Sequence, residues 1–138
     1  MVIKIYTDGG SLNNPGQAAF AYLIYKNDSL LFSFSKPIGI ATNNIAEYTG
    51  LIRALEKIKD IQMQNKLAGL KKIVVRADSL LMISQLNGVY KVKNTNIREC
   101  VLKIRILENE INVPIEYSHV YRKNNQMADS LVKKALGR

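Results

Sequence analysis

The sequence is poor in the residues that build disulfides, zinc sites and His-based catalysis: it has one cysteine, one histidine and no tryptophan. A lone thiol, Cys100, excludes an intrachain disulfide and cannot form a zinc site by itself, so we expect it to pack as a small apolar residue on a helix. No apolar run approaches the length of about 18 residues that a membrane helix needs. The first residues, MVIKIYTDGG, lack the charged and apolar regions of a signal peptide. We therefore expect a cytoplasmic protein without a membrane partner.

Acidic residues are also scarce relative to basic ones. Eleven Asp and Glu face twenty Lys and Arg, which gives a formal net charge of +9. Such an excess favours polyanionic partners, nucleic acid first and anionic membrane surfaces second. The hydrophobic share of 47% and the charged share of 22% are ordinary for a globular protein and exclude a disordered chain. With 138 residues we expect one domain, residues 1–138.

Hydrophobic periodicity predicts nine elements in the order βββαβααβα. Alternation and turn residues predict strands at 2–8, 18–26, 30–36, 71–78 and 113–121, and helical spacing predicts helices at 43–60, 79–88, 95–111 and 124–137. An opening meander followed by strand–helix alternation implies a mixed sheet, because parallel strands need crossover connections. The predicted fold class is α/β, a five-stranded mixed sheet flanked by helices.

One acidic residue lies on the wrong face of the first helix. In TNNIAEYTGLIRALEKI, residues 42–58, Glu47 shares an apolar stripe with Leu51, Ala54 and Ile58. A buried carboxylate costs several kcal/mol unless a cation or hydrogen bonds compensate for it. We therefore expect Glu47 to face a cation, either a metal ion or a Lys or Arg on the sheet.

Two further acids follow strands that we expect to be parallel neighbours. Asp8 ends the first strand and Asp78 ends the fourth, so both carboxylates should emerge at the same edge of the sheet, beside Glu47. Asp129, at the edge of the apolar face of the last helix, would be a fourth. Each acid has a simpler interpretation: Asp8 as a turn residue, Asp78 as a helix cap and Asp129 as a surface residue. Their joint arrangement favours a site for Mg²⁺ or Mn²⁺.

Four segments in the same order make the chain resemble the type-one ribonuclease H family along nearly its whole length. They are YTDGGSLNNPG with Asp8, TNNIAEYTGLIRAL with Glu47, VVRADSLLMISQLNGVYKVKN with Asp78 and NNQMADSLVKKA with Asp129. The resemblance implies a ribonuclease H-like fold and an endonuclease that cuts the RNA strand of RNA–DNA hybrids, leaving 5′-phosphate and 3′-hydroxyl ends. It also implies that these four acids are the catalytic residues and the ligands of two Mg²⁺ or Mn²⁺ ions.

The resemblance further implies contacts with the hybrid. Asn14, Asn43 and Asn44 match positions that the family uses near the minor groove, where the 2′-hydroxyl distinguishes RNA from DNA. Lys91 and Lys93 would contact phosphates in a salt-dependent way that is independent of sequence. We expect the protein to act on the hybrid as a monomer.

The sequence departs from the family pattern at three places. Position 80 is Leu where the family often has Gln, and the segment after Gly88 is short and lacks tryptophan, so the extended basic protrusion of some members is absent. The family's loop histidine has no counterpart in the short RKNN segment. We expect His119, inside YSHVY, to be a structural strand residue, and catalysis to depend on the metals alone or on Arg122 or Lys123.

Two other functions are compatible with the same sequence. A catalytically silent nucleic-acid-binding module could use the same fold, although binding polyphosphate would be easier without four acids. A related nuclease could prefer double-stranded RNA, because a fold does not fix its substrate.

Overall fold

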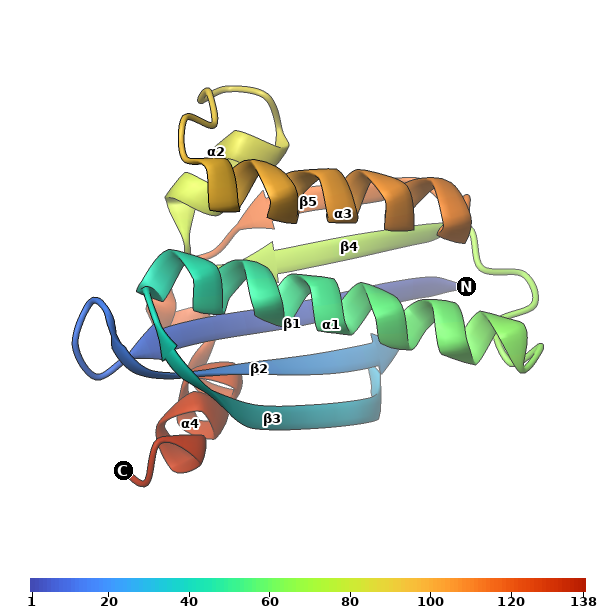
Figure 1. Cartoon of the computed structure of the whole chain (residues 1–138). Helices are drawn as coiled ribbons and strands as arrows, with labels where there is room; N and C mark the ends of the chain where they lie inside the picture. The colour runs from blue at the N-terminus through green and yellow to red at the C-terminus, as the bar shows by residue number, and fades with distance from the viewer.

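The computed structural model describes residues 1–138, and its element order is the predicted one (Figure 1). The strands are β1 (Val2–Ser11), β2 (Gly16–Lys26), β3 (Ser29–Ala41), β4 (Lys72–Ala77) and β5 (Ile115–His119). The helices are α1 (Asn43–Met63), α2 (Leu80–Leu86), α3 (Thr95–Ile111) and α4 (Gln126–Ala135), with a short 3-10 helix, η1 (Arg122–Asn124), before α4. None of the helices combines the length and apolar character that crossing a membrane requires.

The five strands form one mixed sheet in the order β3-β2-β1-β4-β5. The β1–β2 and β2–β3 pairs are antiparallel, whereas β4 pairs in parallel with both β1 and β5. The predicted parallel pairing of the first and fourth strands is therefore confirmed, and α1 lies on the connection between the first three strands and β4. Consequently β1 and β4 end at the same edge of the sheet, on the left in Figure 1.

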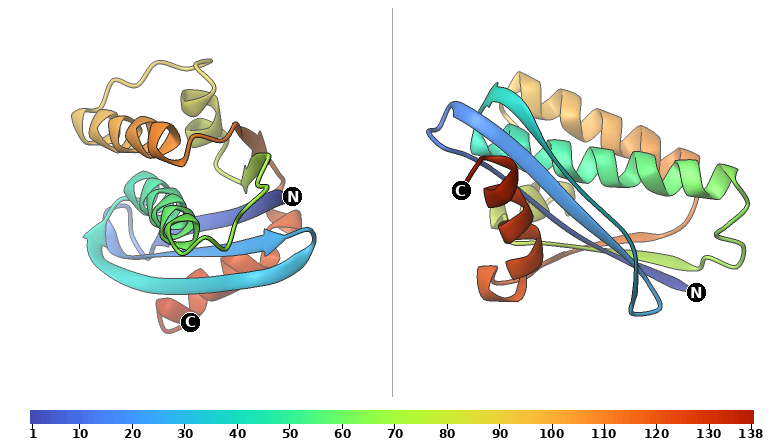
Figure 2. Two further views of the ribbon diagram at one scale, coloured as in Figure 1. Left: turned by 90° about the vertical axis from the view of Figure 1, so that its right-hand side faces the viewer. Right: turned by 90° about the horizontal axis from the view of Figure 1, so that it is seen from below.

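Helices cover the sheet unequally on its two faces. The pair α1 and α3 lies on one face, and α4 lies on the other, near the edge where β1 ends (Figure 2). The main core lies under α1 and α3 and includes Ile5, Phe20, Leu55 and Ile73, all fully buried. Under α4 the core is small: Ala19, Ala21 and Val132. Much of the second face is therefore without a helix.

Some element boundaries differ from the predicted ones, because strand pairing and local capping contacts determine where those elements begin and end. The first strand continues to Ser11, because the β1–β2 ladder extends through Gly9 and Gly10. The last helix begins at Gln126 and not at residue 124, since Arg122–Asn124 form η1. Ser79 lies outside α2 as its N-cap, and its hydroxyl accepts a hydrogen bond from the Met82 amide at 3.2 Å.

Candidate active site

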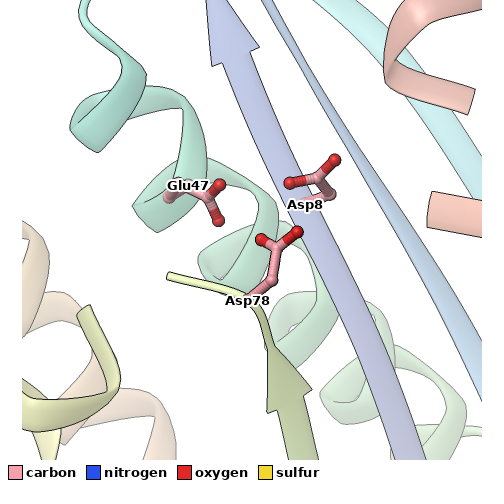
Figure 3. Close-up of side chains that lie close together, drawn as sticks. All are labelled: Asp8, Glu47 and Asp78. Atoms are coloured by element: carbon pink, nitrogen blue, oxygen red, sulfur yellow. The ribbon is translucent and has the colours of Figure 1, made fainter. Parts of the chain in front are cut away.

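Three carboxylates meet at the edge of the sheet where β1 and β4 end. Asp8 lies near the end of β1, Asp78 directly follows β4, and Glu47 projects from the second turn of α1 (Figure 3). One carboxylate oxygen from each residue lies within 4.8 Å of the others. The convergence expected from strand order and helix periodicity is therefore present in the structure.

A close approach between α1 and β1 brings Glu47 to Asp8. A Cβ atom on Gly9 would lie 2.3 Å from the carbonyl carbon of Ala46, a distance that side chains do not tolerate. From the other side, a Cβ on Gly50 would lie 3.2 Å from the carbonyl oxygen of Asp8. These two glycines let the backbones of α1 and β1 come into direct contact. The Glu47 side chain therefore lies beside the end of β1.

Asp8 and Glu47 are buried and Asp78 is half-buried, all without a cation from the protein. Asp8 is 6% and Glu47 8% exposed. Neither they nor Asp78 form a salt bridge, and Oε2 of Glu47 has no hydrogen-bond partner. The interpretation that a Lys or Arg on the sheet neutralises Glu47 is therefore wrong.

Burial and mutual repulsion favour the protonated forms of Asp8 and Glu47. Burial, followed by the charge of Asp78, raises the pKa of Asp8 to about 7. Burial, together with the charges of Asp8 and Asp78, raises the pKa of Glu47 well above its ordinary value. Carboxylate oxygens are the ligands that hard divalent cations prefer, and the unpartnered Glu47 oxygen lacks only such a cation. The residues present therefore fit a divalent metal ion.

Asp129 lines the same polar cleft, of about 380 Å³, but lies outside the three-carboxylate cluster. Its Oδ1 accepts a hydrogen bond from Nη2 of Arg122 at 3.1 Å, and its Oδ2 lies 3.0 Å from Nζ of Lys133. Burial would raise the pKa of Asp129, but the hydrogen bonds from Lys133 and Arg122 outweigh it and lower the pKa. In this structure the fourth acid is thus held by two cations of the protein itself.

The helix-cap interpretation of Asp78 is wrong, because Ser79 caps α2. This leaves the Asp78 carboxylate free to lie in the cleft, which it lines together with Asp8 and Glu47.

Of the three asparagines predicted to contact substrate, Asn43 lines the cleft, and Asn14 is hydrogen-bonded to it. The side-chain oxygen of Asn14 accepts a hydrogen bond from the Asn43 amide at 3.0 Å, and the side-chain oxygen of Asn43 accepts one from the Ser11 amide at 2.8 Å. Asn43 is exposed and lines the cleft, and the adjacent Asn44 is partly exposed. Because the oxygens of Asn14 and Asn43 are used internally, their amide NH₂ groups remain for a ligand.

The lysines predicted to contact phosphates lie farther along the same end of the molecule. Lys91 and Lys93 are exposed, form no ion pair and belong to the connection between α2 and α3, at the upper left of Figure 1. They do not line the acidic cleft.

His119 lies where alternation predicts, as the last residue of β5, beside Ala77 of β4. Its ring packs edge-on against Tyr121, with centroids 5.8 Å apart, and it does not line the cleft. Leu80, where the family often has Gln, is exposed in the first turn of α2.

The sequence pattern missed three residues near the site. Lys133 and Arg138 line the cleft, and the buried Asn125 donates from its side chain to the carbonyl of Thr7 at 2.9 Å. Lys133 could have been found, since it stands four residues after Asp129 and therefore on the same helix face. Neither Arg138 nor Asn125 carries a comparable signal.

Comparisons with known proteins agree with this geometry. Residues 6–135 match the sequence model of a family described as reverse transcriptase-like. The chain is 34% identical over 135 residues to ribonuclease HI of Halobacterium salinarum. The aligned region covers 97% of this chain and 64% of that protein. The structure also resembles that of LC11-RNase H1, isolated from compost, in complex with an RNA/DNA hybrid: the TM-score is 0.88 at 39% identity, covering 98% of this chain and 96% of that one.

Some relatives are much longer. The chain is 33% identical over 138 residues to the bifunctional protein Rv2228c of Mycobacterium tuberculosis, covering 99% of this chain. It spans only 36% of the length of that protein.

Proposed function

The chain belongs to the type-one ribonuclease H family, and we propose that it is an endonuclease that hydrolyses the RNA strand of RNA–DNA hybrids, leaving 5′-phosphate and 3′-hydroxyl ends. We further propose that residues 1–138 form one catalytic domain that acts as a monomer.

The observation that carries the proposal is the cluster of Asp8, Glu47 and Asp78, with oxygens within 4.8 Å of one another and an unpartnered oxygen on Glu47. A site that only binds nucleic acid gains nothing from three acids at its centre, because they repel phosphate. A site that holds divalent cations needs them.

The acids take roles according to their position. Asp8, Glu47 and Asp78 would hold two Mg²⁺ or Mn²⁺ ions, with Asp8 as the ligand shared by both and Asp129, on the same cleft, as a further ligand of the second ion. When bound, such ions supply the charge that activates an attacking water and stabilises the leaving 3′-oxygen. No side chain of the protein has to act as a nucleophile.

Two cations of the protein lie beside these acids. Arg122 and Lys133 hold Asp129 while their side chains remain 71% and 48% exposed, within reach of a phosphate that enters the cleft. Arg122 is a better candidate than Lys123 for assisting the reaction, because Arg122 lines the cleft and Lys123 does not. We propose a structural role for His119.

The rim of the cleft would recognise the hybrid. The free amide groups of Asn14 and Asn43, with Asn44 beside them, are suited to the minor groove, where a 2′-hydroxyl accepts and donates hydrogen bonds. Lys91 and Lys93 would contact phosphates farther along the duplex.

A strand-specific cleavage assay tests the proposal. One strand at a time is labelled in an RNA–DNA hybrid, an RNA duplex and a DNA duplex of the same sequence, with Mg²⁺, with Mn²⁺ and with chelator. We expect cleavage of the RNA strand in the hybrid only, and only with metal. Cleavage of the RNA duplex at a similar rate would favour a double-strand ribonuclease, and metal-independent binding without cleavage would favour a silent binding module.

A further inference from the structure

A second cavity, of about 400 Å³, lies on the sheet face that α4 only partly covers. Its walls come from β1 and β2, from Asp28 in the turn after β2, and from residues 123–128, which run from η1 into the start of α4. The short helix η1 separates it from the acidic cleft, since Arg122 lines the cleft whereas Lys123 and Asn124 line the cavity. Cavities of about 300 to 1,000 Å³ are the size that holds small molecules.

The base of this cavity is aromatic and apolar. The rings of Tyr6 and Tyr25 lie 5.8 Å apart at an angle of 76°, next to Leu23. The hydroxyl of Tyr25 points toward Sδ of Met127, 3.6 Å away, which joins the strand face to α4. Aromatic rings that are held at fixed angles offer a stacking surface for a flat ligand.

Its edge is positively charged. Lys4 and Lys123 both line the cavity; Lys4 pairs with Asp28 at 2.7 Å, and Lys123 has no acidic partner. Behind Tyr6, Nη1 of Arg76 donates a hydrogen bond to the Tyr6 hydroxyl at 2.8 Å and adds a further cation to this face. The lining holds two cations and one acid, Asp28, and Arg76 adds positive charge beside it, an excess that favours an anionic ligand.

Amide side chains complete the lining. Asn124, the last residue of η1, and Gln126, the first residue of α4, are exposed and line the cavity. Each offers both a donor and an acceptor, the combination that reads the edge of a nucleobase.

We propose that this cavity binds a nucleoside phosphate, with the base against Tyr6 and Tyr25 and the phosphate at Lys4 and Lys123. Stacking on aromatic rings combined with cations for the phosphate is how proteins bind unpaired nucleotides of any sequence. The ligand would be a free nucleotide or the unpaired end of a nucleic-acid strand. The site uses none of the four acids and stands apart from hybrid cleavage.

Calorimetric titration of the intact protein with AMP, in chelator and at low salt, tests the proposal. We expect saturable binding at one site, and weaker binding of ribose 5-phosphate and of adenosine, since each lacks one half of the ligand. Lys4→Gln with Lys123→Gln should weaken AMP binding about tenfold. The control Lys66→Gln with Lys71→Gln makes the same change in net charge at exposed positions outside the cavity and should leave binding unchanged.

Amide chemical shifts locate the ligand. AMP should perturb residues 4–6, 23–28 and 123–128, and Tyr25→Leu should reduce these perturbations at equal ligand concentration. Absence of saturable binding would overturn the proposal. The proposal would also be overturned if the Lys4 and Lys123 changes left AMP affinity unchanged while Asp8→Asn increased it. That result would place AMP in the acidic cleft.

Metal-free binding of blunt and single-strand-tailed hybrids then distinguishes the two sources of ligand. A tail that raises affinity in the parent protein but not in the Lys4 and Lys123 variant supports a strand end. Equal affinities, together with AMP binding, support a free nucleotide. Cleavage of blunt hybrid by Tyr25→Leu should stay unchanged, because Tyr25 lines the cavity and not the acidic cleft. Loss of AMP binding and loss of the proposed nuclease activity are therefore separate results.

Discussion

Gly9 of β1 and Glu47 of α1 are in direct backbone contact: a Cβ atom on Gly9 would lie 2.5 Å from the backbone nitrogen of Glu47. The acidic site therefore depends on a strand and a helix approaching more closely than two side chains allow.

We expect Gly9→Ala to lower the free energy of unfolding by about 1 to 3 kcal/mol and to impair activity, because the added methyl group must push α1 and Glu47 away from Asp8. Denaturant unfolding and hybrid cleavage measure the two effects. Gly10→Ala is the matched control, since its Cβ would meet nothing closer than Val132 at 3.8 Å. Equal stability of the two variants would show that the helix can shift without cost.

We expect Asp78→Asn to reduce cleavage at least about a hundredfold while leaving hybrid binding measurable. The amide keeps the shape of the side chain but removes charge that is worth several kcal/mol to the reaction. Cleavage and binding assays on the same hybrid test this. Asp60→Asn, an exposed acid without an ion pair, should behave as the parent. Near-normal Mg²⁺-dependent turnover in Asp78→Asn would falsify the proposed site.

The metal-free protein should lose stability as the pH rises from about 4 to about 7. The pKa of Asp8 is about 7 in the folded state and that of Glu47 is also raised, whereas both are near 4 in an unfolded chain, so the folded state binds more protons in this window. The loss should be roughly 2 to 4 kcal/mol, measured by urea unfolding in chelator at several pH values. Asp8→Asn should make the free energy of unfolding less dependent on pH. In the parent protein, saturating Mg²⁺ at pH 7.5 should recover the stability lost in chelator. If the free energy of unfolding of Asp8→Asn changed with pH as much as that of the parent, Asp8 would not be the titrating group.

Arg122→Ala should reduce turnover by about ten- to a hundredfold with little change in stability. Its ion pair with Asp129 is largely exposed and contributes little to folding, but its position in the cleft suits the phosphate. Lys123→Ala, the adjacent cation outside the cleft, should leave cleavage of blunt hybrid near normal. Single-turnover rates separate the two variants. The reverse ranking would assign the assisting role to Lys123.

Lys91→Ala with Lys93→Ala should weaken hybrid binding and reduce the slope of log affinity against log salt by up to about two phosphate contacts. The metal-activation curve should not move. Lys66→Ala with Lys71→Ala makes the same charge change near the connection between α1 and β4, at the opposite end of the sheet, and serves as the control. An unchanged salt slope in the first variant would mean that Lys91 and Lys93 are only solvated.

The order of elements and the position of three acids follow from the sequence alone. Alternation and helical spacing define which face of a strand or helix a residue occupies, and a parallel connection places two strand ends at one edge. From these rules Asp8 and Asp78 must emerge together, and Glu47 must point inward toward them. Periodicity placed Asp129 only at the edge of the apolar face of the last helix, as a possible fourth acid. The family resemblance added the substrate contacts, which periodicity does not reveal.

Which cations of the protein pair with these acids is visible only in the tertiary structure. Periodicity gives the face on which a residue lies but no distance between elements, so it could not show that Arg122 and Lys133 hold Asp129 or that no cation of the protein reaches Glu47. Nor could it place Tyr6 of β1, Tyr25 of β2 and Lys123 around one cavity. These contacts join segments far apart in the chain, and they depend on how closely the elements pack, which a pattern along one segment does not contain.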